Sequence, residues 1–410
     1  MTAVDGDLDG VLVIERELWA GGPPHELFAQ MRQSCPVHWS DRITEYPTED
    51  GFWSVTRADD IHAVSRDWRT FSSELGGVTA VMAAFPIELS RAMFIGMDPP
   101  KHDRLKALFQ LGFSPKRIAG HEQAIRNIAA GVLDGLEGRE RCDLVSEVAQ
   151  PVVSRVIGSF MGIPPEDDAI WASLMNATLG ASDPDLNPGG IEAAVERDIP
   201  EIFERCRAMI AQRREQPTDD LTSLLVHADI DGERLEEHEI VMGFFLLVAA
   251  GNDSTKATYA SGMRALMENP DQRQLLLEDR SLVPSAVEEA LRMFPAFAHF
   301  RRTATCDTEL GGQTIRQGQK VIMWYVSSNR DETRYEDPER FDVTRNPEHQ
   351  AFGAGGRHFC LGTALARLEL RIMFEETLAR YPQMQMDGEP TFVESPFINQ
   401  LKTLPVRLCP

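Results

Sequence analysis

Apolar residues recur at helical spacing over most of the chain between Glu26 and Arg280. Residues three and four positions apart share one face of an α-helix, so this pattern predicts a series of amphipathic helices. Proline-containing stops such as Ser114-Pro115 and Ile163-Pro164-Pro165 separate the segments. The first two thirds of the chain are therefore expected to be mainly helical.

The longest predicted helix extends from Glu236 to Met267. At about 1.5 Å per residue it is long enough to cross a whole domain. A shorter helix is predicted from Pro284 to Met293, because proline suits the first helical turn and Pro295 prevents continuation.

The period then changes to that of β-strands. Alternating or continuous apolar runs, separated by Gly311-Gly312 and Gln317-Gly318, predict a small antiparallel sheet at about 308–326 from the segments 309–310, 313–316 and 320–326. A loop-rich stretch follows, and helical spacing returns over 361–380.

No repeat, low-complexity tract or flexible linker divides the chain, which favours one large domain over residues 1–410. Its expected fold class is mainly α, helix-rich over 26–295 and 361–380, with a minor antiparallel β region.

Charge and targeting signals narrow the functional classes. The 410 residues carry a net charge of -23, which opposes binding to nucleic acid or anionic lipid. The acidic start lacks the features of a signal peptide, and six scattered cysteines suit a reducing compartment. The longest apolar run, Ile240 to Gly251, is shorter than the roughly 20 residues of a membrane span. We expect a cytoplasmic protein without a membrane anchor.

The segment Ala351 to Gly362 is rich in glycine and holds Cys360 where the loop enters a helix. Glycine lets a backbone approach a flat ligand, and a helix N-terminus or a metal favours a thiolate. There are two alternatives: the cysteine is only a packing residue, or the glycine loop binds phosphate. The phosphate interpretation lacks a Lys-Ser/Thr after the glycines and a buried strand before them.

This loop, with three further motifs in the same order, resembles the cytochrome P450 superfamily of haem-thiolate monooxygenases over nearly the whole chain. The resemblance implies that Cys360 is the axial ligand of a haem b iron and that Arg357 and His358 flank a propionate. The chain departs from the family at Gly353, which holds the place of an aromatic, while Phe352 lies one residue earlier.

A second motif contains Glu289 and Arg292, three residues apart on the helix that begins at Pro284. Such a pair is often only a surface ion pair of little energy. The resemblance implies instead a buried structural triad completed by Arg340.

A third motif, Asp98 to Lys106, is a proline turn that leads into a helix, which by itself suits a capped surface helix. By resemblance, this helix and a fourth motif at Arg302 reach the haem propionates. The complete implied cofactor-binding set is His102, Lys106, Arg302, His358, Cys360, Ala250, Phe352 and Gly362.

The segment Ala249 to Thr255 interrupts the longest helix with glycine and short polar residues, which are unfavourable in helix interiors. A helix bent by back-bonding hydroxyls, without chemistry, is the alternative. The resemblance implies an oxygen-activating groove: Gly251 gives room for dioxygen, Asp253 passes protons, and Ser254 or Thr255 provides the hydroxyl.

The implied reaction inserts one atom of dioxygen into a C–H bond of a hydrophobic small molecule, with sterol, isoprenoid or branched lipid chains favoured. By position, the substrate pocket is expected to involve the loop from Leu75 to Phe94 and the residues Phe245, Ala249, Phe297, Ala298 and Phe397.

Electrons are expected from a ferredoxin and its reductase, docked on a basic patch of Arg104, Lys106, Lys116, Arg357 and Arg367. Three other interpretations stay open: a peroxygenase that uses peroxide directly, a haem or lipid sensor without turnover, and a nucleotide-binding protein.

Overall fold

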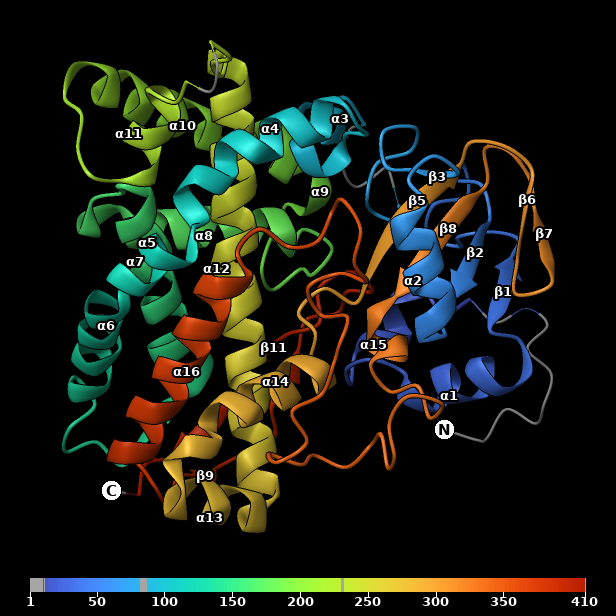
Figure 1. Ribbon diagram of the computed structural model, residues 1–410. Helices are drawn as coiled ribbons and strands as arrows, with labels where there is room; N and C mark the ends of the chain where they lie inside the picture. Colours follow the sequence, from blue (N-terminus) through green and yellow to red (C-terminus); the bar gives the residue numbers. More distant parts are fainter. Residues whose placement is uncertain (1–9, 11, 82–86, 230–231, 410) are drawn as a thin grey trace.

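The computed structural model describes residues 10, 12–81, 87–229 and 232–409. Most helices fill one part of the molecule, and the main sheet with α1, α2 and α15 forms the other (Figure 1). This arrangement confirms the predicted class, a mainly helical single domain with a minor β component.

The helices are α1 (His25–Ser34), α2 (Ala58–Arg66), α3 (Ile87–Ala92), α4 (Lys101–Gln110), α5 (Pro115–Gly120), α6 (Glu122–Asp134), α7 (Gln150–Met161), α8 (Asp168–Leu179), α9 (Gly190–Ala193), α10 (Ile199–Glu215), α11 (Leu221–Val226), α12 (Glu237–Glu268), α13 (Pro270–Glu278), α14 (Val283–Met293), α15 (Tyr325–Ser328) and α16 (Thr363–Arg380). Single 3-10 or π turns occupy Arg16–Trp19, Phe94–Gly96, Leu111–Phe113, Val145–Ala149, Pro165–Asp167, Ala194–Asp198 and Arg280–Leu282. Within the described residues, no helix combines the length and apolar character needed to cross a bilayer.

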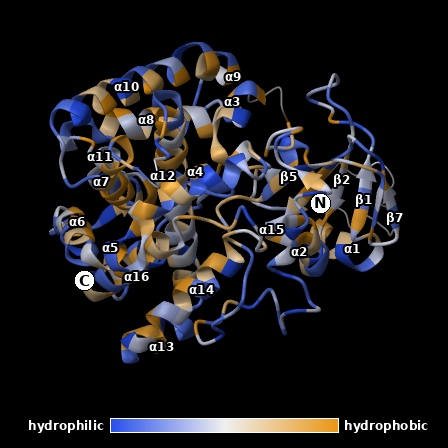
Figure 2. Cartoon of the chain, turned by 45° about the horizontal axis from the view of Figure 1, so that its top comes forward, coloured by the Kyte–Doolittle hydropathy of each residue, from blue (hydrophilic) through white to orange (hydrophobic). Residues whose placement is uncertain are grey.

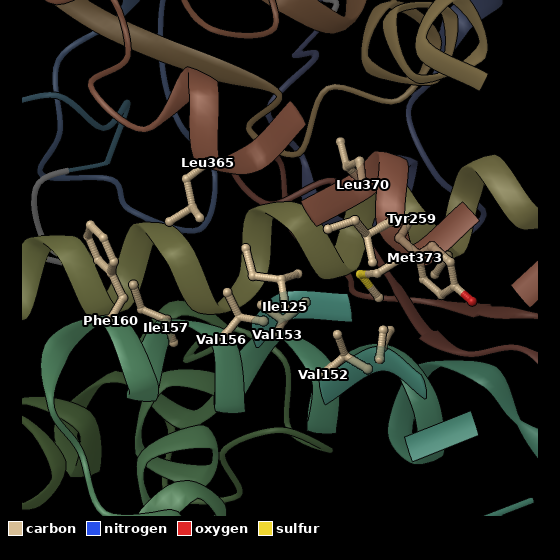
Figure 3. Packing of buried hydrophobic residues seen from close by; sticks show 14 of the residues in the cluster. Ile125, Val152, Val153, Val156, Ile157, Phe160, Tyr259, Leu365, Leu370 and Met373 are labelled. Carbon is tan, nitrogen blue, oxygen red and sulfur yellow. The ribbon is translucent and has the colours of Figure 1, made fainter. Parts of the chain in front are cut away.

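Helix α12 is the central element and begins with a capping box, in which Glu236 and Glu239 each satisfy a backbone N–H of the first turn. It packs between α7 and α16 (Figure 3). Most of its residues are buried, along almost the whole length of the helix. Hydrophobic residues follow α12 through the interior, whereas peripheral loops are mostly hydrophilic (Figure 2). Burial against both neighbours therefore holds the helix continuous through the glycine and polar residues in its middle.

The main sheet has the strand order β1 (Val37–Ser40), β2 (Phe52–Val55), β8 (Lys320–Trp324), β5 (His299–Ala304) and β3 (Phe71–Ser72). Neighbouring strands are antiparallel except for the β2–β8 pair. Three of these strands, β1, β2 and β3, lie in the stretch that the sequence pattern assigned mainly to helices. Strands of two to four residues are too short for their periodicity to be distinguished.

The predicted small sheet is only partly correct. Strands β6 (Thr308–Leu310) and β7 (Gln313–Ile315) form the expected hairpin, but β8 does not join it. Every residue of β8 is buried, so the strand lies between two neighbours inside the larger sheet. The remaining strands are β4 (Arg141–Asp143), β9 (Gln385–Met386), β10 (Thr391–Phe392), β11 (Leu401–Thr403) and β12 (Pro405–Arg407).

Candidate active site

Two cavities meet in the interior. We call the first the cysteine cavity, since Cys360 lies in its wall together with residues of α4, α12 and α16. The second, the apolar cavity, is lined mainly by hydrophobic side chains. The residues shared by both walls are Ile95, Leu246, Ala250, Phe297 and Phe300. A ligand in the apolar cavity therefore reaches the cysteine cavity past α12.

The loop before Cys360 is shaped by its glycines. Gly353, Gly355 and Gly356 have φ angles of 93°, 82° and 79°, a region that other residues rarely adopt. A Cβ on Gly356 would lie 2.5 Å from the carbonyl oxygen of Ser65 on α2, so no larger residue fits there. The backbone N–H of Cys360 donates to the carbonyl of Phe352 at 2.9 Å. These contacts help to fix the position of the sulfur.

The Cys360 side chain is exposed to the cysteine cavity although it lies deep in the molecule. Burial raises the pKa of its thiol, and the Gly362 amide, Lys106 and Arg367 oppose that shift only in part. The Gly362 amide at the helix start does lower this pKa, as expected, but desolvation of the charged sulfur outweighs it. A metal ion at the sulfur would deprotonate it.

Basic side chains gather at one edge of the cysteine cavity. The rings of His102 and His358 lie 4.2 Å apart between centroids, and Arg302 lines the same wall. Burial lowers the pKa of both histidines; the hydrogen bond with Asp103 opposes this shift for His102, whereas neighbouring cations add to it for His358. Arg302 is almost completely buried, yet within the described part of the chain only its Nη1 donates a hydrogen bond, to the carbonyl of Arg301 at 2.7 Å. This edge of the cavity is therefore suited to an anionic group.

Lys106 also lines the cysteine cavity, but its ammonium group binds the backbone. Nζ donates to the carbonyls of Arg357 and Phe359, which links α4 to the cysteine loop. Arg357 was predicted to flank the same anion as His358. Its side chain is 51% exposed, is not among the residues that line the cysteine cavity and pairs with Asp103.

The opposite wall comes from the middle of α12. Ala250, Gly251, Ser254 and Thr255 line the cysteine cavity. The Ser254 hydroxyl donates to the carbonyl of Ala250 at 2.7 Å, one turn earlier. A Cβ on Gly251 would approach Ile157 of α7 to 2.9 Å, so close packing of α12 on α7 is itself a reason for glycine here.

Asp253 does not line either cavity. It is buried and forms an ion pair with Lys256 on the next turn. Lys256 Nζ also donates to Gln150 Oε1 at 2.9 Å and to Asn176 Oδ1 at 2.8 Å. One Asp253 carboxylate oxygen has no hydrogen-bond partner within the described part of the chain. The structure therefore places Asp253 toward α7 and α8 and separates it from the cavity that Ser254 faces.

Glu369 is a site residue that sequence analysis missed. It lies on α16, is almost completely buried, lines the cysteine cavity and accepts a hydrogen bond from Thr255. Burial raises its carboxyl pKa to about 8, and the bond from Thr255 opposes the shift. The available signal was a carboxylate four residues after Leu365, on the apolar face of the predicted helix.

The predicted structural triad is correct in two of its three members. Glu289 and Arg292 are fully buried and pair at 2.7 Å. The third side chain is Arg345, whose Nε lies 3.2 Å from Glu289. Arg340 is 61% exposed and only its backbone carbonyl faces Arg292. The motif placed the backbone correctly, but the direction of the Arg340 side chain depends on the turn that follows.

The apolar cavity includes most of the predicted substrate residues. Phe245, Ala249, Phe297 and Phe397 line it, as do Val78 to Val81 of the predicted substrate loop. Residues 82–86 of that loop lie outside the described residues. Ala298 does not line it; it packs in a separate core cluster with Trp19, Phe28 and Trp324.

Haem was the cofactor implied by the sequence, and the side chains present fit it. The cysteine cavity offers one sulfur in its wall, largely apolar surfaces and a basic edge whose guanidinium has few hydrogen-bond partners. These features match a flat metalloporphyrin with two carboxylates. All eight residues of the implied cofactor-binding set line this cavity, namely His102, Lys106, Arg302, His358, Cys360, Ala250, Phe352 and Gly362.

The fold and this site define a haem-thiolate protein, and comparison with known proteins specifies the family. The family model described as Cytochrome P450 matches residues 191–409. The chain belongs to the cytochrome P450 family; it is a P450 monooxygenase with haem b as its cofactor.

Relatives agree over nearly the whole length. The chain is 38% identical to a methyl-branched lipid omega-hydroxylase of Mycobacterium tuberculosis, with 92% of this chain and 90% of the relative covered. It is 32% identical to a steroid C26-monooxygenase of Rhodococcus jostii, with 97% and 84% covered. A Mycobacterium marinum cytochrome P450 solved in complex with pseudoionone superposes with a TM-score of 0.89 at 36% identity, with 99% and 100% covered.

Proposed function

We propose that this monooxygenase hydroxylates a C–H bond of a lipid-like molecule with a sterol, isoprenoid or branched-chain skeleton. The observation that carries the proposal is the apolar cavity, which joins the cysteine cavity at Ala250 and Phe297. Its aromatic and aliphatic walls exclude water and suit a hydrocarbon body. Relatives named for methyl-branched lipid and steroid oxidation support the same substrate class.

In this proposal Cys360 binds the haem iron as a thiolate. When bound, haem supplies the activation of dioxygen and the transfer of one oxygen atom. His102, Arg302 and His358 would hold its propionates, with Arg302 supplying the positive charge, and Lys106 holds the cysteine loop against α4. The Glu289–Arg292 pair keeps the chain beneath the cavity in place.

In this proposal, residues of the α12 wall transfer the protons that the reaction needs. Ser254 is the proposed oxygen-activating hydroxyl, because its side chain faces the cysteine cavity and is already oriented by Ala250. The Thr255 hydroxyl is instead committed to Glu369. Asp253 supplies protons in this proposal, and its pair with Lys256 must loosen for it to do so.

Electrons are proposed to come from a ferredoxin and its reductase. Of the five cations of the predicted basic patch, Arg104, Arg357 and Arg367 form ion pairs and Lys106 binds backbone carbonyls. Lys116 is exposed and carries no ion pair among the described residues. Electrostatic steering of an acidic ferredoxin predicts that turnover falls as ionic strength rises. Turnover insensitive to salt would argue against this docking patch.

The test of the proposed function uses the purified holoprotein. The reduced carbon monoxide complex should give the absorption band of a thiolate-ligated haem. A panel of branched alcohols, isoprenoids and sterols should then shift the haem spin state, and active compounds should yield hydroxylated products only with an electron supply. Spin-state shifts without product under any electron supply would contradict the proposal.

A further inference from the structure

The apolar cavity has one polar end. Most of its wall is aliphatic or aromatic, but Glu15, Arg16, Glu45 and Tyr46 gather on it from two segments near the N-terminus. We call these four residues the polar mouth. The wall shared with the cysteine cavity includes Ala250 and Phe297, and none of the four mouth residues belongs to it. A long ligand that fills the apolar cavity therefore meets the mouth with one part and the oxidation site with another.

Most groups of the polar mouth are only weakly engaged. Arg16 Nη1 lies 3.8 Å from a Glu394 carboxylate oxygen and 3.5 Å from the Ser182 carbonyl, both long contacts. Glu15 accepts the Thr44 backbone N–H at 3.4 Å. The Tyr46 hydroxyl makes no hydrogen bond within the described part of the chain. These groups are therefore free to exchange their present contacts for a ligand.

The charge balance of the mouth is negative. Among the described residues that line the apolar cavity, Arg16 is the one cationic side chain and Glu15 and Glu45 are the carboxylates; a Glu394 carboxylate oxygen lies 3.8 Å from Arg16. Burial and Glu45 raise the pKa of the half-buried Tyr46 phenol, so this group stays a neutral hydrogen-bonding hydroxyl. A carboxylate brought to the mouth would be repelled by more charges than attract it, whereas a neutral oxygen meets hydrogen-bonding groups without that penalty.

We propose that the substrate carries an uncharged oxygen, an alcohol or a ketone, that binds at the polar mouth through Tyr46 and Arg16, and that the mouth rejects the corresponding carboxylic acid. This inference rests on the proposed function and specifies its substrate class: a neutral lipid whose hydrocarbon end points toward Cys360. Oxidation is thereby directed to carbons far from the polar group.

The experiment measures binding by the spin-state shift of the holoprotein, with three ligands that share the farnesyl chain: farnesol, farnesylacetone and farnesoic acid. At neutral pH the alcohol and the ketone should bind at least tenfold more tightly than the acid. Glu45→Gln and Glu15→Gln should each tighten binding of the acid severalfold and leave the alcohol nearly unchanged. Glu17→Gln is the matched control, because Glu17 is exposed, lies beside the same residues and does not line the cavity.

A second arm tests the hydrogen bond. Tyr46→Phe should weaken binding of the alcohol severalfold and leave farnesane, the hydrocarbon without oxygen, unaffected. The proposed role of the polar mouth would be overturned if the acid bound the unchanged protein as tightly as the alcohol does. It would also be overturned if Glu45→Gln and Glu15→Gln behaved like Glu17→Gln. If those results come with electron-dependent hydroxylation, the proposed function stands and only this inference falls. If no member of the series binds, this inference falls, and the proposed function is decided by its own panel of branched alcohols, isoprenoids and sterols.

Discussion

The two walls of the cysteine cavity are built in opposite ways. The cysteine loop is held by backbone contacts: glycines that alone fit against α2, and the Cys360 amide bonded to Phe352. The α12 wall is lined by short polar side chains, and two carboxylates beside it, Asp253 and Glu369, each keep an oxygen without a hydrogen-bond partner among the described residues. Buried polar groups are normally satisfied, so such exceptions concentrate where proteins do chemistry. One wall fixes a position, and the other holds the groups that we propose to move protons.

The largest effect is expected from a substitution in the cysteine loop. Cys360→Ser should abolish the thiolate band of the reduced carbon monoxide complex and all monooxygenase activity, because the hydroxyl does not replace the sulfur donor. The absorption spectrum and product assay check this. Cys306→Ser is the control, since Cys306 is exposed and remote from both cavities, and it should leave the spectrum intact. An unchanged spectrum in Cys360→Ser would refute the ligand assignment.

The next prediction concerns the support beneath that wall. Glu289→Gln should destabilise the fold by about 3 kcal/mol or more, since it leaves the fully buried Arg292 without its charge partner. Arg345→Ala should have a smaller effect, and Arg340→Ala almost none, because the Arg340 side chain is exposed. Denaturant unfolding of the three variants measures this order. A larger loss for Arg340→Ala than for Arg345→Ala would contradict the observed triad.

On the α12 wall, Ser254→Ala and Asp253→Asn should keep haem and its spectrum but lower the product formed per electron consumed, by about tenfold or more. Coupling is measured as product against oxygen uptake. Thr255→Ala should uncouple less, because the Thr255 hydroxyl is bonded to Glu369. If Ser254→Ala and Asp253→Asn both stay fully coupled, the residues of the α12 wall do not transfer protons.

The smallest expected effect is a change in the pH dependence of stability. Burial raises the Glu369 pKa to about 8, above that of an unfolded carboxyl. The folded protein therefore holds this proton where the unfolded chain has released it, so stability should fall as pH rises from about 4.5 toward 8. Glu369→Gln removes the titrating group and should flatten that slope. Thermal unfolding between pH 5 and 8 compares the two proteins, and identical slopes would contradict the assignment.

Several site residues were predictable because their signals are local. The glycine loop with its cysteine, the Glu289–Arg292 spacing and the polar interruption of the longest helix all follow from neighbouring residues. Glu369, Arg345 and the polar mouth gave no comparable signal. Glu369 matters only because α16 packs it against Thr255, and the mouth joins two separate segments at one cavity.

The same division runs through the fold. Helix periods and the glycine turns are short-range properties, so the sequence by itself determined the helices, the β6–β7 hairpin and the position of the cysteine at a helix start. Tertiary structure decided which sheet β8 enters, that Ala298 faces the core, and that Asp253 pairs with Lys256 away from the cavity. The reason is physical: burial and pairing are set by whichever distant segment packs against a residue, and its own neighbours in sequence do not specify that segment.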